Sequence, residues 1–111
     1  MCLERSERNG YKNEDLFLMI AEDEQDKIQG FIWACKQEKP QDSVMILSLY
    51  VARDYRRQGI ATKLKELLEK WCRQEGIKTI HTTTHYNNHN MIVLNQKLGY
   101  VPGMVHMIKT L

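Results

Sequence analysis

Residues 49–61 read LYVARDYRRQGIA, which combines an apolar strand, a short basic turn and the first residues of a helix. The start of a helix leaves backbone N–H groups without intrahelical partners, and the helix dipole adds partial positive charge there. Because Gly59 has no Cβ, we expect the backbone amides of Arg57, Gly59, Ile60 and Ala61 to close around phosphate oxygens. Arg56 and Arg57 would add positive charge beside them. The stretch therefore predicts a pyrophosphate cradle.

Two common phosphate cradles do not match this stretch. A P-loop needs a Gly-Lys-Ser/Thr ending, and the dinucleotide fingerprint needs three glycines followed by an acidic residue. The order that is present, Arg56-x-x-Gly59-x-Ala61 after an apolar Leu49-Tyr50-Val51 strand, resembles motif A of the GNAT superfamily of acyl-CoA N-acyltransferases. The alternative interpretation is a basic loop that only caps a helix.

A second segment resembles the same family. Residues 88–100 follow the pattern Asn-x-x-Met-Ile-x-Leu-Asn-x-Lys-Leu-Gly-Tyr, which is similar to motif B of the GNAT superfamily. The resemblance covers roughly residues 15–111. It implies transfer of an acetyl group from acetyl-CoA to a primary amine of a small molecule or peptide, by direct attack in a ternary complex. The alternative is a catalytically weak module of the same fold that binds CoA or a partner protein.

Length and composition indicate one domain spanning residues 1–111. The chain is 42% hydrophobic and 27% charged, which is typical of a soluble globular protein. A net charge of +2 is too small to argue for a nucleic acid or a membrane surface as partner. The three cysteines form neither an even set nor a Cys-x-x-Cys motif, so we expect no disulfide framework and no zinc site. No signal peptide or membrane span is evident, and we expect a cytoplasmic protein.

The hydrophobic pattern predicts a mixed α/β fold with the order α-β-β-β-α-β-α-β. A helix over 59–75 carries apolar residues at helical spacing, with Lys65/Glu69 and Glu66/Lys70 as opposite-charge i,i+4 pairs. Because a helix connects strands 43–52 and 77–83, we expect this pair to be parallel. The other expected elements are the end of a helix in residues 1–10 stopped by Gly10, strands at 15–22 and 27–37, a helix at 88–98 and a last strand or hairpin at 100–111.

The resemblance also assigns parts of the acetyl-CoA site. It implies that the amide of Leu49 holds the thioester carbonyl, that Val51 pairs with the pantetheine arm, and that Asn88 lies by the cofactor. Asn95 interrupts an apolar helical stripe, where an unpaired amide would cost about 1–3 kcal/mol. Asn95 therefore either bonds a neighbouring strand or donates an N–H to the cofactor. The family often has a tyrosine here that protonates the CoA thiolate, and asparagine cannot do so.

The catalytic acid and base are less well marked. Strand 43–51 carries no carboxylate, so Glu22 is the candidate general base, with a water relay as the alternative. Tyr50, Tyr86 and His85 are candidate proton donors. The spacing of His81, His85 and His89 would suit a metal only on one helix, and because a strand and a turn are expected there we predict no metal.

The start of the chain leads to a prediction about assembly. The resemblance implies an opening strand and two helices, and residues 1–10 leave room for only one helix of about three turns. The apparent loss of the opening strand and one helix would leave apolar sheet surface uncovered. We therefore expect a homodimer.

Overall fold

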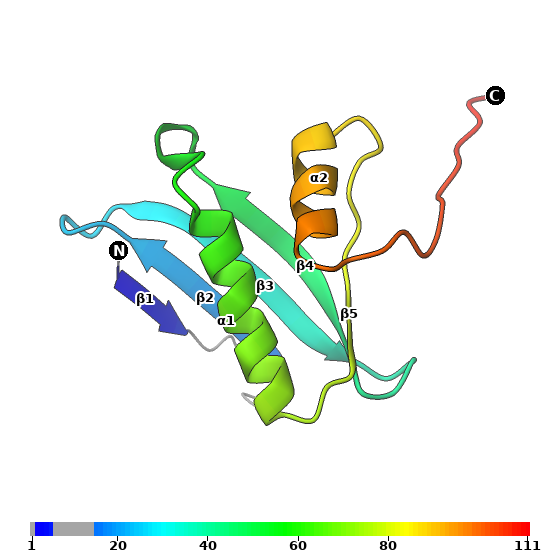
Figure 1. Ribbon diagram of the computed structural model, residues 1–111, viewed down its shortest axis with the longest axis horizontal. Helices are drawn as coiled ribbons and strands as arrows, with labels where there is room; N and C mark the ends of the chain where they lie inside the picture. Colours follow the sequence, from blue (N-terminus) through cyan, green and yellow to red (C-terminus); the bar gives the residue numbers. More distant parts are fainter. Residues whose placement is uncertain (1, 6–14) are drawn as a thin grey trace.

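The structure is a computed structural model that describes residues 2–5 and 15–111. The described strands form one sheet with the order β1-β2-β3-β4-β5 (Figure 1). All neighbouring strands are antiparallel except β4 and β5, which are parallel as expected. The elements are β1 (Cys2–Arg5), β2 (Leu16–Glu22), β3 (Ile28–Gln37), β4 (Ser43–Val51), a 3-10 turn η1 (Arg53–Tyr55), α1 (Ile60–Gln74), β5 (Thr79–His81) and α2 (His89–Lys97).

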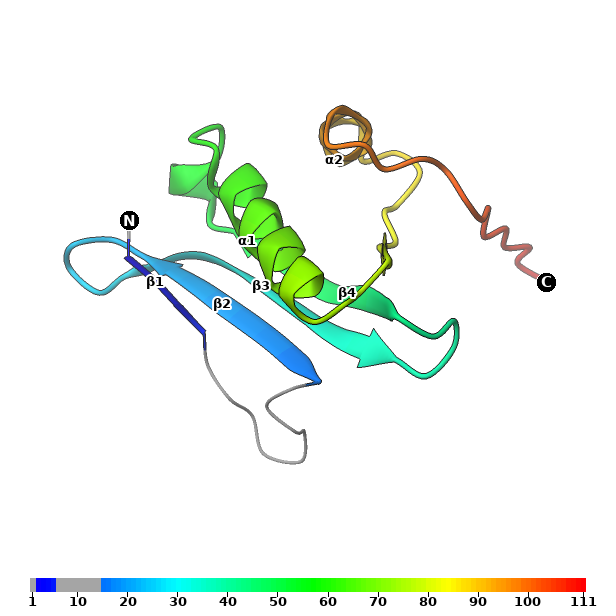
Figure 2. The same cartoon turned by 60° about the horizontal axis from the view of Figure 1, so that its bottom comes forward.

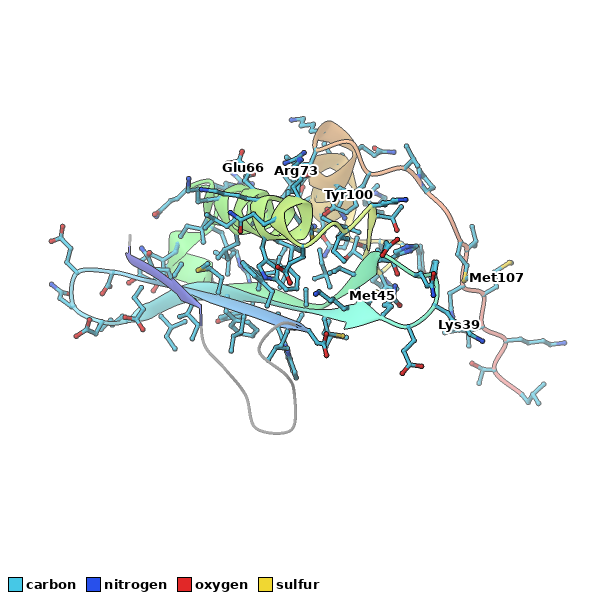
Figure 3. The ribbon with its side chains drawn as sticks, turned by 90° about the horizontal axis from the view of Figure 1, so that it is seen from below. Lys39, Met45, Glu66, Arg73, Tyr100 and Met107 are labelled. Atoms are coloured by element: carbon cyan, nitrogen blue, oxygen red, sulfur yellow. The ribbon has the colours of Figure 1, made fainter. Side chains whose placement is uncertain are left out.

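Helix α1 supplies half of the hydrophobic core. Its apolar stripe packs on the side chains that β2, β3 and β4 point toward it, because alternate residues of a strand share one face of the sheet. Both helices lie on this same side of the sheet (Figures 2 and 3). Neither has the length and apolar character needed to cross a bilayer, among the residues the structure describes. The core comprises Phe17, Ala21, Ile32, Ala34, Val44, Ile46, Ile60, Leu64, Leu68, Trp71 and Cys72.

The prediction of an opening helix is wrong for the residues of that segment that the structure describes. Cys2–Arg5 is strand β1, which pairs antiparallel with residues 19–22 of β2. An edge strand forms because a partner strand offers it a row of hydrogen-bonding groups, and this partner is distant in the sequence. The opening strand that the sequence seemed to lack is therefore present. The expected stop at Gly10 lies outside the described residues.

The prediction of a last strand or hairpin at 100–111 is also wrong. Residues 101–111 form neither helix nor strand, and they run away from the sheet beyond α2 (Figure 1). The large apolar side chains of this segment are almost fully exposed, as for Met104 at 92% and Met107 at 87%. A strand is stable only when it pairs with a neighbour, and no described strand lies beside this segment.

Candidate functional site

A cleft opens where β4 and β5 separate. Their pairing ends after Met45 and His81, although β4 continues to Val51. The cleft has a volume of about 280 Å³. Its walls come from β4, the segment after β5, and both helices. It is lined by Ile46, Leu47, Ser48, Leu49, Lys65, Thr82, Thr83, Thr84, His85, Asn88 and Met91.

The backbone of β4 points free amides toward this cleft. The N–H of Ala52 donates to Gln29 O at 2.8 Å, so this amide faces β3. Successive amides of a strand point to alternate sides, and therefore the N–H groups of Leu49 and Val51 face away from β3. No described strand pairs with β4 on that side beyond Met45. The amides of Leu49 and Val51 thus face the open side of β4, and their bonding of a ligand stays a prediction.

A β-bulge lies beside these amides. Trp33 is opposite Ser48 and Ala34 is opposite Ile46, so Leu47 is an extra residue in β4. A bulge bends the strand and interrupts its ladder locally. The bulge coincides with the part of β4 that lines the cleft.

The segment predicted to form the cradle lies at the start of α1. Gly59 caps the helix in the left-handed conformation with φ 79°, and no side chain caps this end. Arg57 also has a positive φ, 65°, which is uncommon for a residue with a side chain. None of the N–H groups of residues 57–62 has a partner in the part of the chain that the structure describes. The amides of Arg57, Gly59, Ile60 and Ala61 are therefore unpaired among the described residues, and their binding of an anion stays a prediction.

Two contacts hold the loop that leads into the cradle. Arg56 Nε donates to Val51 O at 3.0 Å, so this side chain fastens the loop to the end of β4 as well as carrying charge. The hydroxyl of Tyr55 donates to Asp23 Oδ2 at 2.9 Å in the turn between β2 and β3. The pKa of Asp23 is lowered mainly because its carboxylate accepts the backbone N–H of Lys27, with a further contribution from Tyr55.

Three catalytic candidates lie away from the cleft. Glu22 ends β2, and β3 separates it from β4, so about 10 Å of sheet lies between Glu22 and the cleft. Tyr50 points to the sheet face opposite α1, where its ring lies 5.8 Å from that of Phe31. Its neighbours Leu49 and Val51 pack against the core instead. Tyr86 is 80% exposed. The prediction that Tyr50 donates a proton in the cleft is therefore wrong, because strand alternation turns it to the other face.

His85 is the candidate that does line the cleft. Its ring stacks on Tyr86 with 4.8 Å between the centroids, and its Nδ1 lies 2.5 Å from Asn87 Oδ1. His85 is exposed at the rim. In the described part of the chain, no three His, Cys, Asp or Glu residues are grouped so that they could hold a metal ion.

The two asparagines of the second motif have different surroundings. Asn88 lines the cleft and caps α2, because its side chain accepts the N–H of Met91 at 3.3 Å. Asn95 is buried, and its Nδ2 donates to Thr84 Oγ1 at 3.3 Å. Asn95 thus holds a wall segment of the cleft, and its partner Thr84 lies in the segment after β5 rather than in a strand. Its Oδ1 is buried without a partner, so a direct contact with the cofactor stays a prediction.

The sequence analysis missed Lys65. We expected an i,i+4 ion pair with Glu69, but Lys65 is 2% exposed and lines the cleft. Glu69 instead pairs with Arg73 at 3.7 Å. The sequence did contain a signal for this burial. Lys65 lies three residues before Leu68 and seven before Cys72, and this spacing places it on the apolar side of the helix.

Comparisons with known proteins identify the family of the chain. A model of the acetyltransferase (GNAT) family matches residues 2–100. The acetyl transferase GW6a of Oryza sativa subsp. japonica is 35% identical over 91 residues, covering 73% of this chain and 22% of that protein. The probable N-acetyltransferase camello of Xenopus laevis is 32% identical over 79 residues, covering 71% of this chain and 36% of that protein. The chain therefore spans about a fifth to a third of the length of these relatives.

A solved structure shows the same fold. The aminoglycoside N-acetyltransferase AAC(6')-Iy, determined in complex with CoA, has a TM-score of 0.74 and 19% identity. The match covers 86% of this chain and 76% of that one. The family model spans both motifs, the cradle and the cleft, and on this match the chain belongs to the GNAT family of acetyltransferases.

Proposed function

We propose that this chain transfers an acetyl group from acetyl-CoA to a primary amine of a small molecule or peptide. One observation carries the proposal: the start of α1, with its unpaired amides, follows the end of β4, whose own unpaired amides face away from β3. The pyrophosphate of acetyl-CoA would bond the first set, with Arg56 and Arg57 nearby. The pantetheine arm would then run along Val51 into the cleft.

The reacting groups follow from this path. The amide of Leu49 would bond the thioester carbonyl and stabilise the negative charge that develops on its oxygen during attack. A neutral acceptor amine would attack this carbon directly. Glu22 is too far from the cleft to remove the proton by contact, which favours a relay of water molecules between them.

Two features support homodimer formation as part of this proposal. Both helices cover the same face of the sheet (Figure 2), and the other face carries half-buried apolar side chains such as Leu18, Ile20 and Phe31. A second copy would cover that face. The acceptor pocket would then be more open than is usual in the family, or completed in part by the neighbouring subunit.

The experiment has two stages. Calorimetric titration with CoA tests the cradle and the cleft. Incubation with acetyl-CoA and a panel of polyamines, aminosugars and peptides, followed by mass spectrometry, then tests transfer. We expect binding of CoA and the gain of one acetyl group on at least one class of amine. No binding of CoA would contradict the proposal, and binding without transfer to any amine would favour a CoA-binding module.

A further inference from the structure

Lys65 is a buried cation in the wall of the cleft. Lys65 is 2% exposed and lies in the middle of α1, among the buried residues of that helix. Glu66 and Arg73 of the same helix point away from the sheet (Figure 3). Lysine is almost never fully buried unless it has a partner. The position of Lys65 therefore calls for a chemical reason.

The surroundings of Lys65 contain little compensating charge. Its Nζ lies 4.6 Å from the centre of the Tyr100 ring, which is a cation–π contact on the helix side of the sheet. Neither ion pair found among the described residues includes Lys65. Glu69 lies one turn away, and His85 is the other titratable side chain that lines the cleft. The remaining walls, from β4 and the threonines at 82–84, are uncharged.

We propose that Lys65 donates a proton to the CoA thiolate as it leaves, a role that rests on the proposed acetyl transfer. In this step the acceptor nitrogen bonds the carbonyl carbon and the carbon–sulfur bond breaks. The electron pair of that bond stays on sulfur, which takes a proton from the ammonium of Lys65. The new amide loses its extra proton to solvent, and the neutral Lys65 amine recovers a proton from water.

The acidity of Lys65 suits this role. Burial lowers the pKa of Lys65 to about 8, while the charge of Glu69 acts in the opposite direction. A cysteine thiol has a pKa of about 8.5, and a thiolate at least as basic as that of cysteine can take a proton from a group with a pKa of about 8. Proton transfer is most efficient when the pKa of the donor lies near the working pH.

The other candidates fit this role less well. Asn95 stands where the family often has tyrosine, and its amide cannot release a proton. Tyr50 points to the opposite face of the sheet, and Tyr86 is 80% exposed. His85 is at the solvent-exposed rim, whereas Lys65 lies in the buried wall.

The test measures the pKa of the thiol of bound CoA and requires no acceptor amine. A nearby ammonium favours the thiolate and lowers the pKa of the thiol. The ultraviolet absorbance of the thiolate is followed against pH in the complex with CoA, with the complex with desulfo-CoA as the blank for the protein's own groups. Lys65→Met removes the charge, and Lys65→Gln is a second neutral variant if the first does not fold. Lys70→Met is the matched control, because Lys70 is an exposed lysine of the same helix.

We expect the apparent pKa of the bound thiol to rise by about one unit in Lys65→Met, a tenfold lower ratio of thiolate to thiol at fixed pH. Lys70→Met should leave the thiol pKa unchanged. Lys65→Arg keeps the charge, so the thiol pKa should stay low in that variant. An equal thiol pKa in wild type and Lys65→Met, with CoA bound to both, would overturn the role of Lys65 but not the acetyl transfer. Absence of CoA binding to the wild type would overturn both. Acetylation of Lys65 itself by acetyl-CoA would show that it is a nucleophile and overturn the proposal.

Discussion

The backbone of Gly59 places the free amides of the cradle. Its φ of 79° is unfavourable for other residues, and a Cβ there would project into open space that the phosphate would occupy. We expect Gly59→Val to weaken CoA binding at least tenfold, about 1.4 kcal/mol, in a calorimetric titration.

Gly76 provides the matched control for Gly59. It has a φ of 73°, its Cβ would also meet open space, and it lies at the other end of α1. Gly76→Val should lose stability in the same way, because both variants strain the backbone. Its affinity for CoA should not change. Equal affinities in the two variants would contradict the assignment of the cradle.

Lys65 links stability to pH. The pKa of Lys65 in the folded state is about 8, below its ordinary value of 10.5. The free-energy cost of burying the charge is therefore present in full below pH 8. Between these values the unfolded state binds more protons, and the free energy of unfolding should rise with pH. Replacing the buried charge by an apolar side chain removes the cost of taking that charge out of water. We expect Lys65→Met to be more stable than wild type at pH 7.

Urea denaturation at pH 7 and at pH 10 measures this difference. The advantage of Lys65→Met should shrink at the higher pH, because the wild-type lysine then becomes neutral in the folded state. Lys70→Met again serves as the control and should show no such trend. A difference that is the same at both pH values would mean that Lys65 is not buried as a charge.

At the scale of elements, α2 depends on its caps. Only Asn95 of its residues is buried, so packing holds this short helix less firmly than α1. The side chain of Asn88 accepts the N–H of Met91, and Gly99, with φ 94°, follows its C-cap. We expect Asn88→Ala to lower the free energy of unfolding by about 1 kcal/mol.

Asn88→Asp separates capping from cofactor binding. Aspartate caps a helix as well as asparagine does, so this variant should recover the stability that Asn88→Ala loses. If Asn88 also contacts the cofactor, the affinity for CoA should stay low in both variants. Chemical denaturation and calorimetry measure the two effects. A loss of stability in Asn88→Asp equal to that in Asn88→Ala would show that the cap contributes nothing.

At the scale of the whole molecule, the sheet face that no helix of residues 2–5 and 15–111 covers should determine assembly. Phe31 and Tyr50 form a ring pair there, and Tyr50 is 45% exposed. We expect a two-fold dimer in sedimentation at micromolar concentration, and we expect Phe31→Glu to shift it toward monomer, since a charge would be buried between the copies. Tyr86→Ser removes an exposed ring elsewhere and should remain dimeric. A wild-type monomer would contradict the prediction.

The sequence by itself determined the elements whose patterns are local. Apolar spacing and glycine stops placed α1, α2 and the strands β2, β3 and β4 within one or two residues of their observed bounds. The order of strand, helix and strand was enough to predict that β4 and β5 are parallel. The left-handed glycine at the start of α1 could be located as well, because a strand, a basic turn and a glycine are consecutive in the chain.

The tertiary structure alone decided the features that depend on a distant partner. The opening residues 2–5 form a strand because β2 offers them an edge, and residues 101–111 form none because no strand lies beside them. Lys65 is buried because Tyr100 and the walls of the cleft close over one flank of α1. Local spacing describes the face of one element, whereas burial depends on what packs against that face, and for Lys65 these are segments far away in the sequence.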